Sequence, residues 1–289
     1  MTSDHAAAGR GIPLHPSGQD IFVAGRQAEQ SGRLEQARRQ YESAVATDPG
    51  HADWHYRLGC VCLKLEDPVS AENAFRRALD LEPASASTLT NLGVALDRQG
   101  RRDEAVRAYR RSLQHGGTAV AHHNLGSIHA EEGRTEEAVR SFAAAIALAP
   151  DAEAYLNLGL VHVARGDHAE ALACFEQAVT RDPEFALGHY HAALCLKKTG
   201  RYAEACRKFA RAWSLDARLA RVPFHVGTCL HKQERYEEAR RSLEQALEFF
   251  PDDGRVHYQL ALTCDALGLP QEARGHYGRA RALGPDGRS

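Results

Sequence analysis

The chain has 289 residues, of which 43% are hydrophobic, so it is long enough and apolar enough to bury a core in one or two domains. Its formal net charge is −2, which provides no overall attraction for nucleic acid or an anionic membrane. No apolar run has the length of a signal peptide or of a membrane span. We therefore expect a soluble cytoplasmic protein that binds no nucleic acid and does not insert into a membrane.

Seven cysteines are scattered along the chain, an odd number without the spacing of a disulfide framework. Cys60 and Cys62 form a C-x-C pair, but no second pair follows at the spacing of a zinc site. We expect reduced thiols that pack as small side chains.

A repeat of 33 or 34 residues accounts for residues 18–286. Residues 1–17 are expected to form a flexible leader and residues 287–289 a short tail. The eight repeats begin near residues 18, 52, 86, 119, 152, 186, 220 and 254.

Each repeat predicts two helices separated by a short break, as the second repeat illustrates. Its first helix is indicated by residues that recur at helical spacing, namely His55, Leu58, Gly59 and Cys62. Its second helix runs from Ala71 through Phe75 and ends near Pro83, since the residue before proline disfavours the α conformation. In other repeats a glycine such as Gly100 provides the left-handed residue that ends the first helix.

Four columns of residues are shared by nearly all repeats. Position 20 is always alanine, and position 32 is proline in six repeats. Position 8 is always small: Gly25, Gly59, Gly93, Gly126, Gly159, Ala193, Gly227 and Ala261. Position 24 is always large: Tyr41, Phe75, Tyr109, Phe142, Phe175, Phe209, Leu243 and Tyr277. The small residues let two helices approach closely, and the large ones fill the space between layers.

These columns resemble the tetratricopeptide repeat, and the resemblance covers more than nine-tenths of the chain. It implies an all-α fold, a right-handed α–α superhelix of eight helix-turn-helix repeats, in which the first helices line a concave groove. The sequence departs from the family at position 4, where tryptophan is usual and histidine occurs in four repeats: His55, His122, His189 and His257. There we expect histidine to replace the usual ring and to satisfy its nitrogens locally.

Positions 2, 5, 6, 9, 12 and 13 of each first helix, which we name the groove stripe, lie opposite the stack-facing positions. At position 6 seven consecutive side chains can form hydrogen bonds: Arg57, Asn91, Asn124, Asn157, His191, His225 and Gln259. Rings stand beside them at position 5, and we include four in the candidate site: Tyr56, Tyr190, Phe224 and Tyr258.

A polar column of this kind suits the backbone of an extended peptide, because an amide both donates and accepts hydrogen bonds. Asn91, Asn124 and Asn157 each precede Leu-Gly and resemble the asparagine ladder of O-linked N-acetylglucosamine transferase. That resemblance implies binding of a substrate peptide backbone. The alternative is that these amides only bridge adjacent first helices.

Basic residues make the predicted groove more positive towards its C-terminal end. Arg221 and Arg255 occupy position 2, with Lys197, Lys198 and Lys232 nearby, and Arg57 and Lys64 have a weaker effect near the second repeat. We therefore expect an acidic segment in a ligand that binds repeats six to eight, unless these charges are only a solvated face. The carboxylate clamp of chaperone-binding tetratricopeptide domains is absent, since position 5 never holds lysine and position 9 never holds asparagine.

Sixteen histidines raise the question of a metal site. His191, His225 and His231 fall on the groove stripe, where a transition metal could draw imidazoles together. No set of four ligands has zinc-site spacing, so we predict neither a metal nor another cofactor. No catalytic motif occurs either, and we predict no enzymatic activity and no catalytic residues.

Three hypotheses about function remain. The first is a scaffold or adaptor that binds an extended peptide segment of another protein. The second is the substrate-recognition module of an enzyme, such as a glycosyltransferase, whose catalytic part lies elsewhere. The initiator methionine and the polar end PDGRS count against that idea, and the lack of a separate capping helix favours it, although residues 271–283 are polar enough to act as a cap. The third is a homo-oligomer in which a repeat end or residues 12–16 dock into a neighbour.

Overall fold

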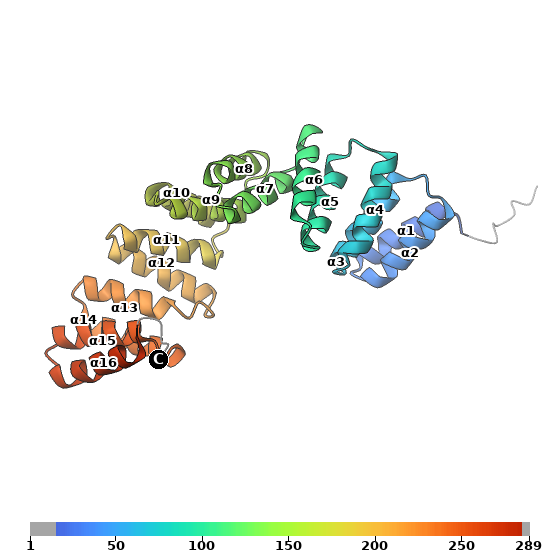
Figure 1. Ribbon diagram of the computed structural model, residues 1–289. Helices are drawn as coiled ribbons and strands as arrows, with labels where there is room; N and C mark the ends of the chain where they lie inside the picture. The colour runs from blue at the N-terminus through green and yellow to red at the C-terminus, as the bar shows by residue number, and fades with distance from the viewer. Residues whose placement is uncertain (1–15, 285–289) are drawn as a thin grey trace, which may run out of the picture. The chain divides into compact units, whose positions relative to one another are not determined.

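The computed structural model describes residues 16–284, and this range contains sixteen α-helices and no β-strand. The helices are α1 (Gly18–Gln30), α2 (Leu34–Thr47), α3 (Ala52–Lys64), α4 (Pro68–Leu81), α5 (Ala86–Arg98), α6 (Arg102–Gln114), α7 (Ala119–Glu131), α8 (Thr135–Leu148), α9 (Ala152–Arg165), α10 (His168–Arg181), α11 (Ala186–Lys198), α12 (Tyr202–Leu215), α13 (Val222–Lys232), α14 (Tyr236–Phe249), α15 (Gly254–Ala266) and α16 (Pro270–Leu283). Odd-numbered helices are the first helices of the repeats and even-numbered ones the second (Figure 1). The predicted all-α array of helix-turn-helix repeats is confirmed.

The helices form two units, Met1–Leu125 and Gly126–Ser289, and the division falls within α7. In each unit, consecutive helices pair as antiparallel hairpins (Figure 1). Residues 1–15 of the predicted leader and residues 287–289 of the predicted tail lie outside the described residues.

The helices of a repeat are separated by a residue in the left-handed conformation. Glycine occupies that place in six repeats, as at Gly100, where φ is +74°. Glu66 and Glu234 occupy it in the second and seventh repeats, with φ of +59° and +60°. Because a side chain is disfavoured there, these two breaks carry backbone strain that the glycine breaks avoid. The seventh repeat also differs at its start, because α13 begins at Val222, next to Pro223, and not at Ala220.

The contact between positions 8 and 24 explains why the first is small. A Cβ atom on Gly93 would lie 2.4 Å from Tyr109 Cε1, and one on Gly159 would lie 2.5 Å from Phe175 Cε1. Six of the position-24 rings are at most 1% exposed: Tyr41, Phe75, Tyr109, Phe142, Phe175 and Phe209. Where position 8 is glycine and position 24 is aromatic, the ring therefore rests directly on the backbone of the first helix, as the sequence pattern indicates.

Three position-4 histidines form the same hydrogen bond to the proline that ends the preceding repeat. Their Nε2 atoms lie 3.0–3.1 Å from a proline carbonyl oxygen, in the pairs His55 with Pro49, His189 with Pro183 and His257 with Pro251. Since a carbonyl only accepts, each Nε2 carries the proton and donates. The expectation that these rings satisfy their nitrogens locally is confirmed for Nε2 at these three positions, but the Nδ1 atom of His189 is buried without a hydrogen-bond partner.

Candidate functional site

Asn91 already uses part of its hydrogen-bonding capacity within unit 1. Its Nδ2 atom on α5 donates to the phenolic oxygen of Tyr56 on α3 at 3.2 Å, and lies 3.5 Å from Cys60 Sγ. No described residue donates a hydrogen bond to its Oδ1 atom. Asn91 therefore bridges two first helices and still presents an acceptor.

Asn124 on α7 has a different partner. Its Nδ2 atom donates to the hydroxyl of Tyr109 at 3.1 Å, and that ring is fully buried on the second helix α6 of the preceding repeat. Burial raises the pKa of Tyr109, so the phenol stays protonated. The amide thus provides a hydrogen-bond donor to this buried hydroxyl. Asn157 on α9 is half-buried in unit 2.

Arg57 and Lys64 in unit 1 each lie beside a carboxylate. Lys64 Nζ lies 2.7 Å from Glu29 Oε1, and Arg57 Nε lies 3.7 Å from Asp53 Oδ1. Burial alone would raise the pKa of Glu29, but hydrogen bonds from Lys64 and Tyr41 lower it below its usual value. The prediction that Arg57 and Lys64 make this region basic is wrong, because the sequence pattern did not reveal which acids lie beside them.

Position 5 does not face the groove in every repeat. Phe22, Thr90 and Leu156 are 5%, 2% and 6% exposed, respectively. Phe22 stacks on Trp54 with centroids 5.2 Å apart, and Thr90 Oγ1 bonds Ser112 Oγ at 2.8 Å. The position-5 rings of the candidate site differ, since Tyr56, Tyr190 and Phe224 are half-buried and Tyr258 is 52% exposed. The groove stripe is therefore open at position 5 only in particular repeats.

His225 on α13 is the centre of a cluster in unit 2. Its Nδ1 atom lies 3.3 Å from Lys197 Nζ, and its Nε2 atom lies 3.2 Å from the hydroxyl of Tyr190. Because an ammonium only donates, Nδ1 accepts and Nε2 carries the proton that it donates to Tyr190. The ring also stacks on Phe209, with centroids 5.3 Å apart and planes 14° apart.

The same surroundings keep His225 neutral. Burial, together with the positive charges of Lys197, Arg221 and Arg255, lowers the pKa of His225 to about 3. Burial also lowers the pKa of Lys197 and of His191. At neutral pH this cluster consists of neutral imidazoles beside a partly buried ammonium, which suits hydrogen bonding more than charge pairing.

Arg221 and Arg255 share one buried carboxylate. Arg221 Nη1 forms an ion pair with Asp253 Oδ2, and Arg255 Nη2 lies 3.2 Å from the same oxygen. Burial would raise the pKa of Asp253, which is 8% exposed, but hydrogen bonds from Arg255 and Arg221 lower it to about 2. Asp253 was not among the residues predicted from the sequence. Its negative charge offsets half of the positive charge assigned to Arg221 and Arg255.

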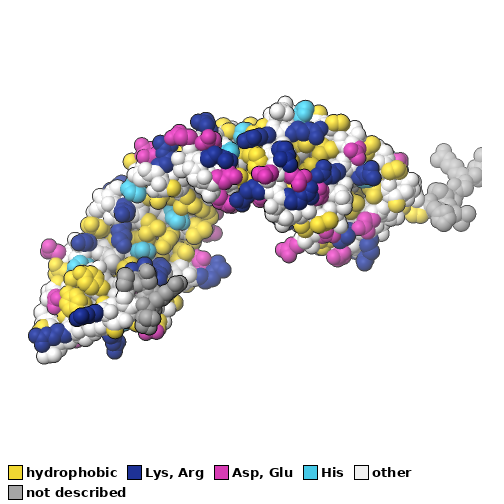
Figure 2. All heavy atoms as spheres, viewed as in Figure 1, with side chains coloured by type: hydrophobic (Ala, Val, Ile, Leu, Met, Phe, Trp, Pro, Cys, Tyr) yellow, Lys and Arg dark blue, Asp and Glu magenta, His cyan; other side chains and the backbone are white. Residues whose placement is uncertain are grey.

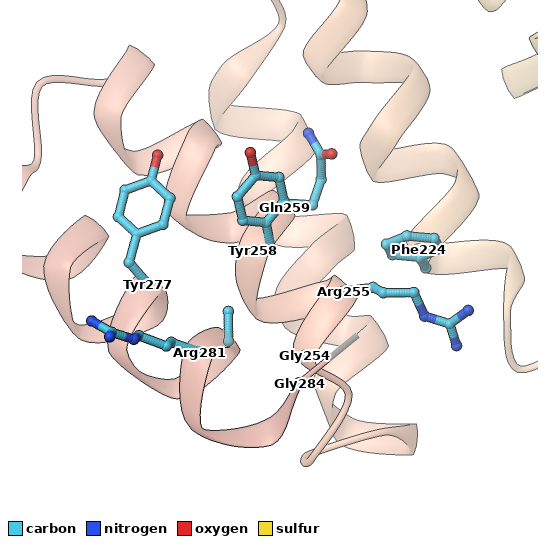
Figure 3. Close-up of a pocket in the computed structure, with 9 residues that line it drawn as sticks. Phe224, Gly254, Arg255, Tyr258, Gln259, Tyr277, Arg281 and Gly284 are labelled. Carbon is cyan, nitrogen blue, oxygen red and sulfur yellow. The ribbon is translucent and has the colours of Figure 1, made fainter. Parts of the chain in front are cut away.

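A pocket of about 750 Å³ in unit 2 brings together four predicted site residues: Phe224, Arg255, Tyr258 and Gln259. The last helix adds Tyr277 and Arg281, which were not predicted as site residues. Figure 3 shows Tyr258 and Tyr277 side by side with their hydroxyls pointing the same way, and their centroids are 6.0 Å apart. The guanidinium groups of Arg255 and Arg281 point away from each other on opposite sides of the tyrosines (Figure 3). We name this the aromatic pocket.

A second pocket of about 490 Å³ lies where α9, α10 and α11 meet. It contains the predicted residue His191, and it is also lined by Val163, His168, Leu194, Lys197 and Lys198. We name it the lysine pocket. Figure 2 shows hydrophobic side chains interspersed with histidines and basic side chains on the visible face of α9–α13.

Neither a metal centre nor a membrane span is found in the described chain. Among residues 16–284, no three His, Cys, Asp or Glu side chains are grouped so that they could hold a metal ion. No helix in the same range is long and apolar enough to cross a membrane. All seven cysteines are free thiols.

Family comparisons agree with the fold. Profiles of the tetratricopeptide repeat match residues 123–174, 156–217 and 216–285, together more than half of the chain. The profile of the middle TPR-like domain of cilia and flagella-associated protein 70 matches residues 23–138. The chain belongs to the tetratricopeptide repeat family. The repeats indicate a protein–protein interaction scaffold, and the family is generally non-catalytic.

Curated relatives match only short segments. The chain is 29% identical over 86 residues to the peroxisomal targeting signal receptor of Candida albicans, covering 29% of this chain and 14% of the receptor. It is 38% identical over 66 residues to tetratricopeptide repeat protein 8 of Caenorhabditis elegans, covering 23% of this chain and 13% of that protein. The chain thus spans about one seventh of the length of these relatives.

Solved structures match over greater lengths. MamA MSR-1 is 26% identical with a TM-score of 0.52, covering 57% of this chain and 95% of that chain. The C-terminal part of a TPR repeat-containing protein from Cytophaga hutchinsonii has a TM-score of 0.65 and covers 83% of this chain and 99% of that chain. At 12% identity, the latter likeness concerns the fold alone.

Proposed function

We propose that this chain is a non-enzymatic scaffold whose groove stripe binds an extended peptide segment of another protein. The observation that carries the proposal is the aromatic pocket, where four residues chosen from the sequence pattern lie together around an open hollow. Aromatic and arginine side chains are enriched at the centres of protein interfaces, because they bury large areas and keep a polar group available. Tyr258 is 52% exposed, whereas Tyr277 is half-buried and donates its hydroxyl proton to Asp265 Oδ2 at 2.7 Å. This tyrosine pair between two arginines is suited to such an interface.

The polar column of unit 2 supports binding along the stripe. Gln259 lines the aromatic pocket and His191 lines the lysine pocket, while His225 lies against Lys197 and beside Phe224. Each neutral hydrogen bond to a peptide contributes only about 0.5–1.5 kcal/mol. Affinity therefore accumulates over several repeats, and short peptides bind weakly.

In unit 1 the ladder has a double role. Asn91 and Asn124 donate to tyrosine hydroxyls, which corresponds to the bridging alternative raised by the sequence. Their amide oxygens accept no hydrogen bond from a described residue and are suited to a peptide N–H. Backbone binding at Asn91, Asn124 and Asn157 is part of the proposal.

The relatives favour the same kind of function. One is named as a receptor for a peroxisomal targeting signal. An acidic stretch in the partner fits Arg281, Lys198 and Lys232, none of which has an ion pair among the described residues. Arg221 and Arg255 contribute less, because they share Asp253.

The proposal is tested by affinity capture from lysate with the full chain. The site variant combines Phe224→Ala, Tyr258→Ala and Gln259→Ala, and the control variant replaces three exposed apolar residues of second helices, by Val69→Ala, Leu81→Ala and Leu148→Ala. We expect proteins captured by the wild type and the control to be lost with the site variant. Equal capture by all three would contradict groove binding.

The same experiment distinguishes the alternatives. Capture of a catalytic subunit whose substrates depend on this chain would favour a recognition module acting in trans. Capture of the chain itself, with a larger particle in light scattering, would favour self-association.

A further inference from the structure

The lysine pocket is lined by basic side chains and by no acidic one. Lys197, Lys198, His168 and His191 line it, and no aspartate or glutamate does. Neither lysine forms an ion pair with a described residue. The nearby acid Asp167 is engaged elsewhere, since its Oδ2 lies 3.0 Å from Arg165 Nε. Lysine and histidine side chains that can donate hydrogen bonds therefore line the pocket, and no carboxylate lines it.

Lys197 is held in place by its neighbours. Its ammonium lies 3.3 Å from His225 Nδ1 and 5.6 Å from the centre of the Phe224 ring. An ammonium has three N–H donors, so contacts with one imidazole and one ring leave donor capacity for a ligand. Burial lowers the pKa of Lys197, and a bound anion would offset that cost.

We infer that the lysine pocket is a subsite for the carboxylate of one aspartate or glutamate side chain in the bound segment. Val163 and Leu194 provide an apolar wall for the methylene groups of that side chain. The two lysines provide compact positive charges, which attract an anion without the paired hydrogen bonds of an arginine. A carboxylate is the anion that an unmodified peptide segment carries on its side chains, so we assign the pocket to it. The inference rests on the proposed function, since it specifies one position of the peptide.

The test uses the full chain and four bead-bound libraries of twelve-residue peptides. Each library has a fixed central residue, namely glutamate, glutamine, phosphoserine or serine, and random flanking residues without cysteine. We expect the glutamate library to retain about three to ten times more protein than the glutamine library. The variant with Lys197→Gln and Lys198→Gln should bind both libraries equally.

Two further variants keep the result interpretable. Lys198 is exposed, and the single variant Lys198→Gln should reduce the preference for glutamate. A thermal unfolding curve like that of the wild type shows that this variant keeps the fold. A matched control removes two exposed positive charges from the second helix α12, by Arg207→Gln and Arg211→Gln, and should keep the preference. Loss of the preference in the control would overturn the inference, since overall charge would then explain it.

The outcomes separate the inference from the proposed function. If all libraries bind but glutamate is not preferred to glutamine, the subsite is wrong and peptide binding stands. If phosphoserine is retained better than glutamate, the assignment to a carboxylate is wrong. If no library binds, the proposed peptide-binding function itself fails, and the subsite with it.

Discussion

Asn91 Nδ2 donates a hydrogen bond to the hydroxyl of Tyr56 across the boundary between the second and third repeats, at 3.2 Å. We expect Asn91→Ala to lower the free energy of unfolding by about 0.5–1.5 kcal/mol, because the bond is lost. Tyr56→Phe should cost a similar amount, and the double variant should cost less than the sum. Urea unfolding of the four proteins measures the coupling, and strict additivity would show that the bond does not stabilise the fold.

Gly159 should not tolerate a methyl group. A Cβ atom there would lie 2.5 Å from Phe175 Cε1, so the ring or the helix must move. Gly159→Ala should lower stability by about 1–3 kcal/mol in thermal or urea unfolding. Gly275→Ala is the matched control, because nothing lies within 4 Å of a Cβ added to that helical glycine. The control should raise stability by about 0.5–1 kcal/mol, and a stabilised Gly159→Ala would refute the packing argument.

His225 should make the fold sensitive to acid. Its pKa is about 3 in the fold, below the unfolded value of about 6.5. Between these values the unfolded chain binds a proton that the folded chain does not, so the contribution is complete above about pH 6.5 and is lost as the pH falls towards 3. The positive charges of Lys197, Arg221 and Arg255 act in the same direction.

The pH dependence is measured by urea unfolding from pH 7.5 to pH 4. The titration of one such group changes the free energy of unfolding by at most about 1.4 kcal/mol per pH unit. His225→Gln should reduce the slope of the free energy of unfolding against pH by up to that amount. The exposed His115→Gln is the control for replacing one histidine by glutamine. An identical slope in wild type and His225→Gln would contradict a neutral, buried His225.

Cys206 should be the most reactive thiol of the partly exposed cysteines. A hydrogen bond from the Cys229 thiol, with Gln233 Nε2 at 3.6 Å, lowers the pKa of Cys206 to about 7. Burial raises the pKa of Cys60 and Cys174, which are also half-buried. At pH 7.5, iodoacetamide should label Cys206 about tenfold faster than either, because the thiolate is the nucleophile.

Peptide mass spectrometry at successive times measures the labelling. Gln233→Leu should slow the labelling of Cys206 and leave Cys174 unchanged. Earlier labelling of Cys60 or Cys174 would show that the hydrogen bonds to Cys206 do not stabilise its thiolate.

Much of the fold was predictable because its defining contacts are local and repeated. The contact between Gly93 and Tyr109 joins two residues of one repeat, and the same pair of residue types recurs along the chain. The bond from His257 to Pro251 is also local, and it spans only the loop between two repeats. Such contacts leave a periodic signal that can be read without coordinates.

The candidate site was predictable only in part. Phe224, Arg255, Tyr258 and Gln259 lie around one pocket, and all four were chosen by their position in the repeat. Tyr277 and Arg281 were missed, since they belong to a second helix and the residues in the column of Tyr277 are buried in the preceding repeats. The burial of Phe22, Thr90 and Leu156 was missed as well, because one column does not have the same neighbours in every repeat.

By itself, the sequence determined the helical hairpins and the stripe of first-helix residues, since helical periodicity decides which residues share a face. Only the tertiary structure decided how the polar residues on that stripe are used. Asn91 is bound to Tyr56, and Arg221 is paired with Asp253, residues 35 and 32 positions apart. Lys197 instead lies beside a histidine and a phenylalanine in a pocket without a carboxylate. Hydrogen bonding and charge depend on distances between side chains of different repeats, and no repeat pattern specifies those distances.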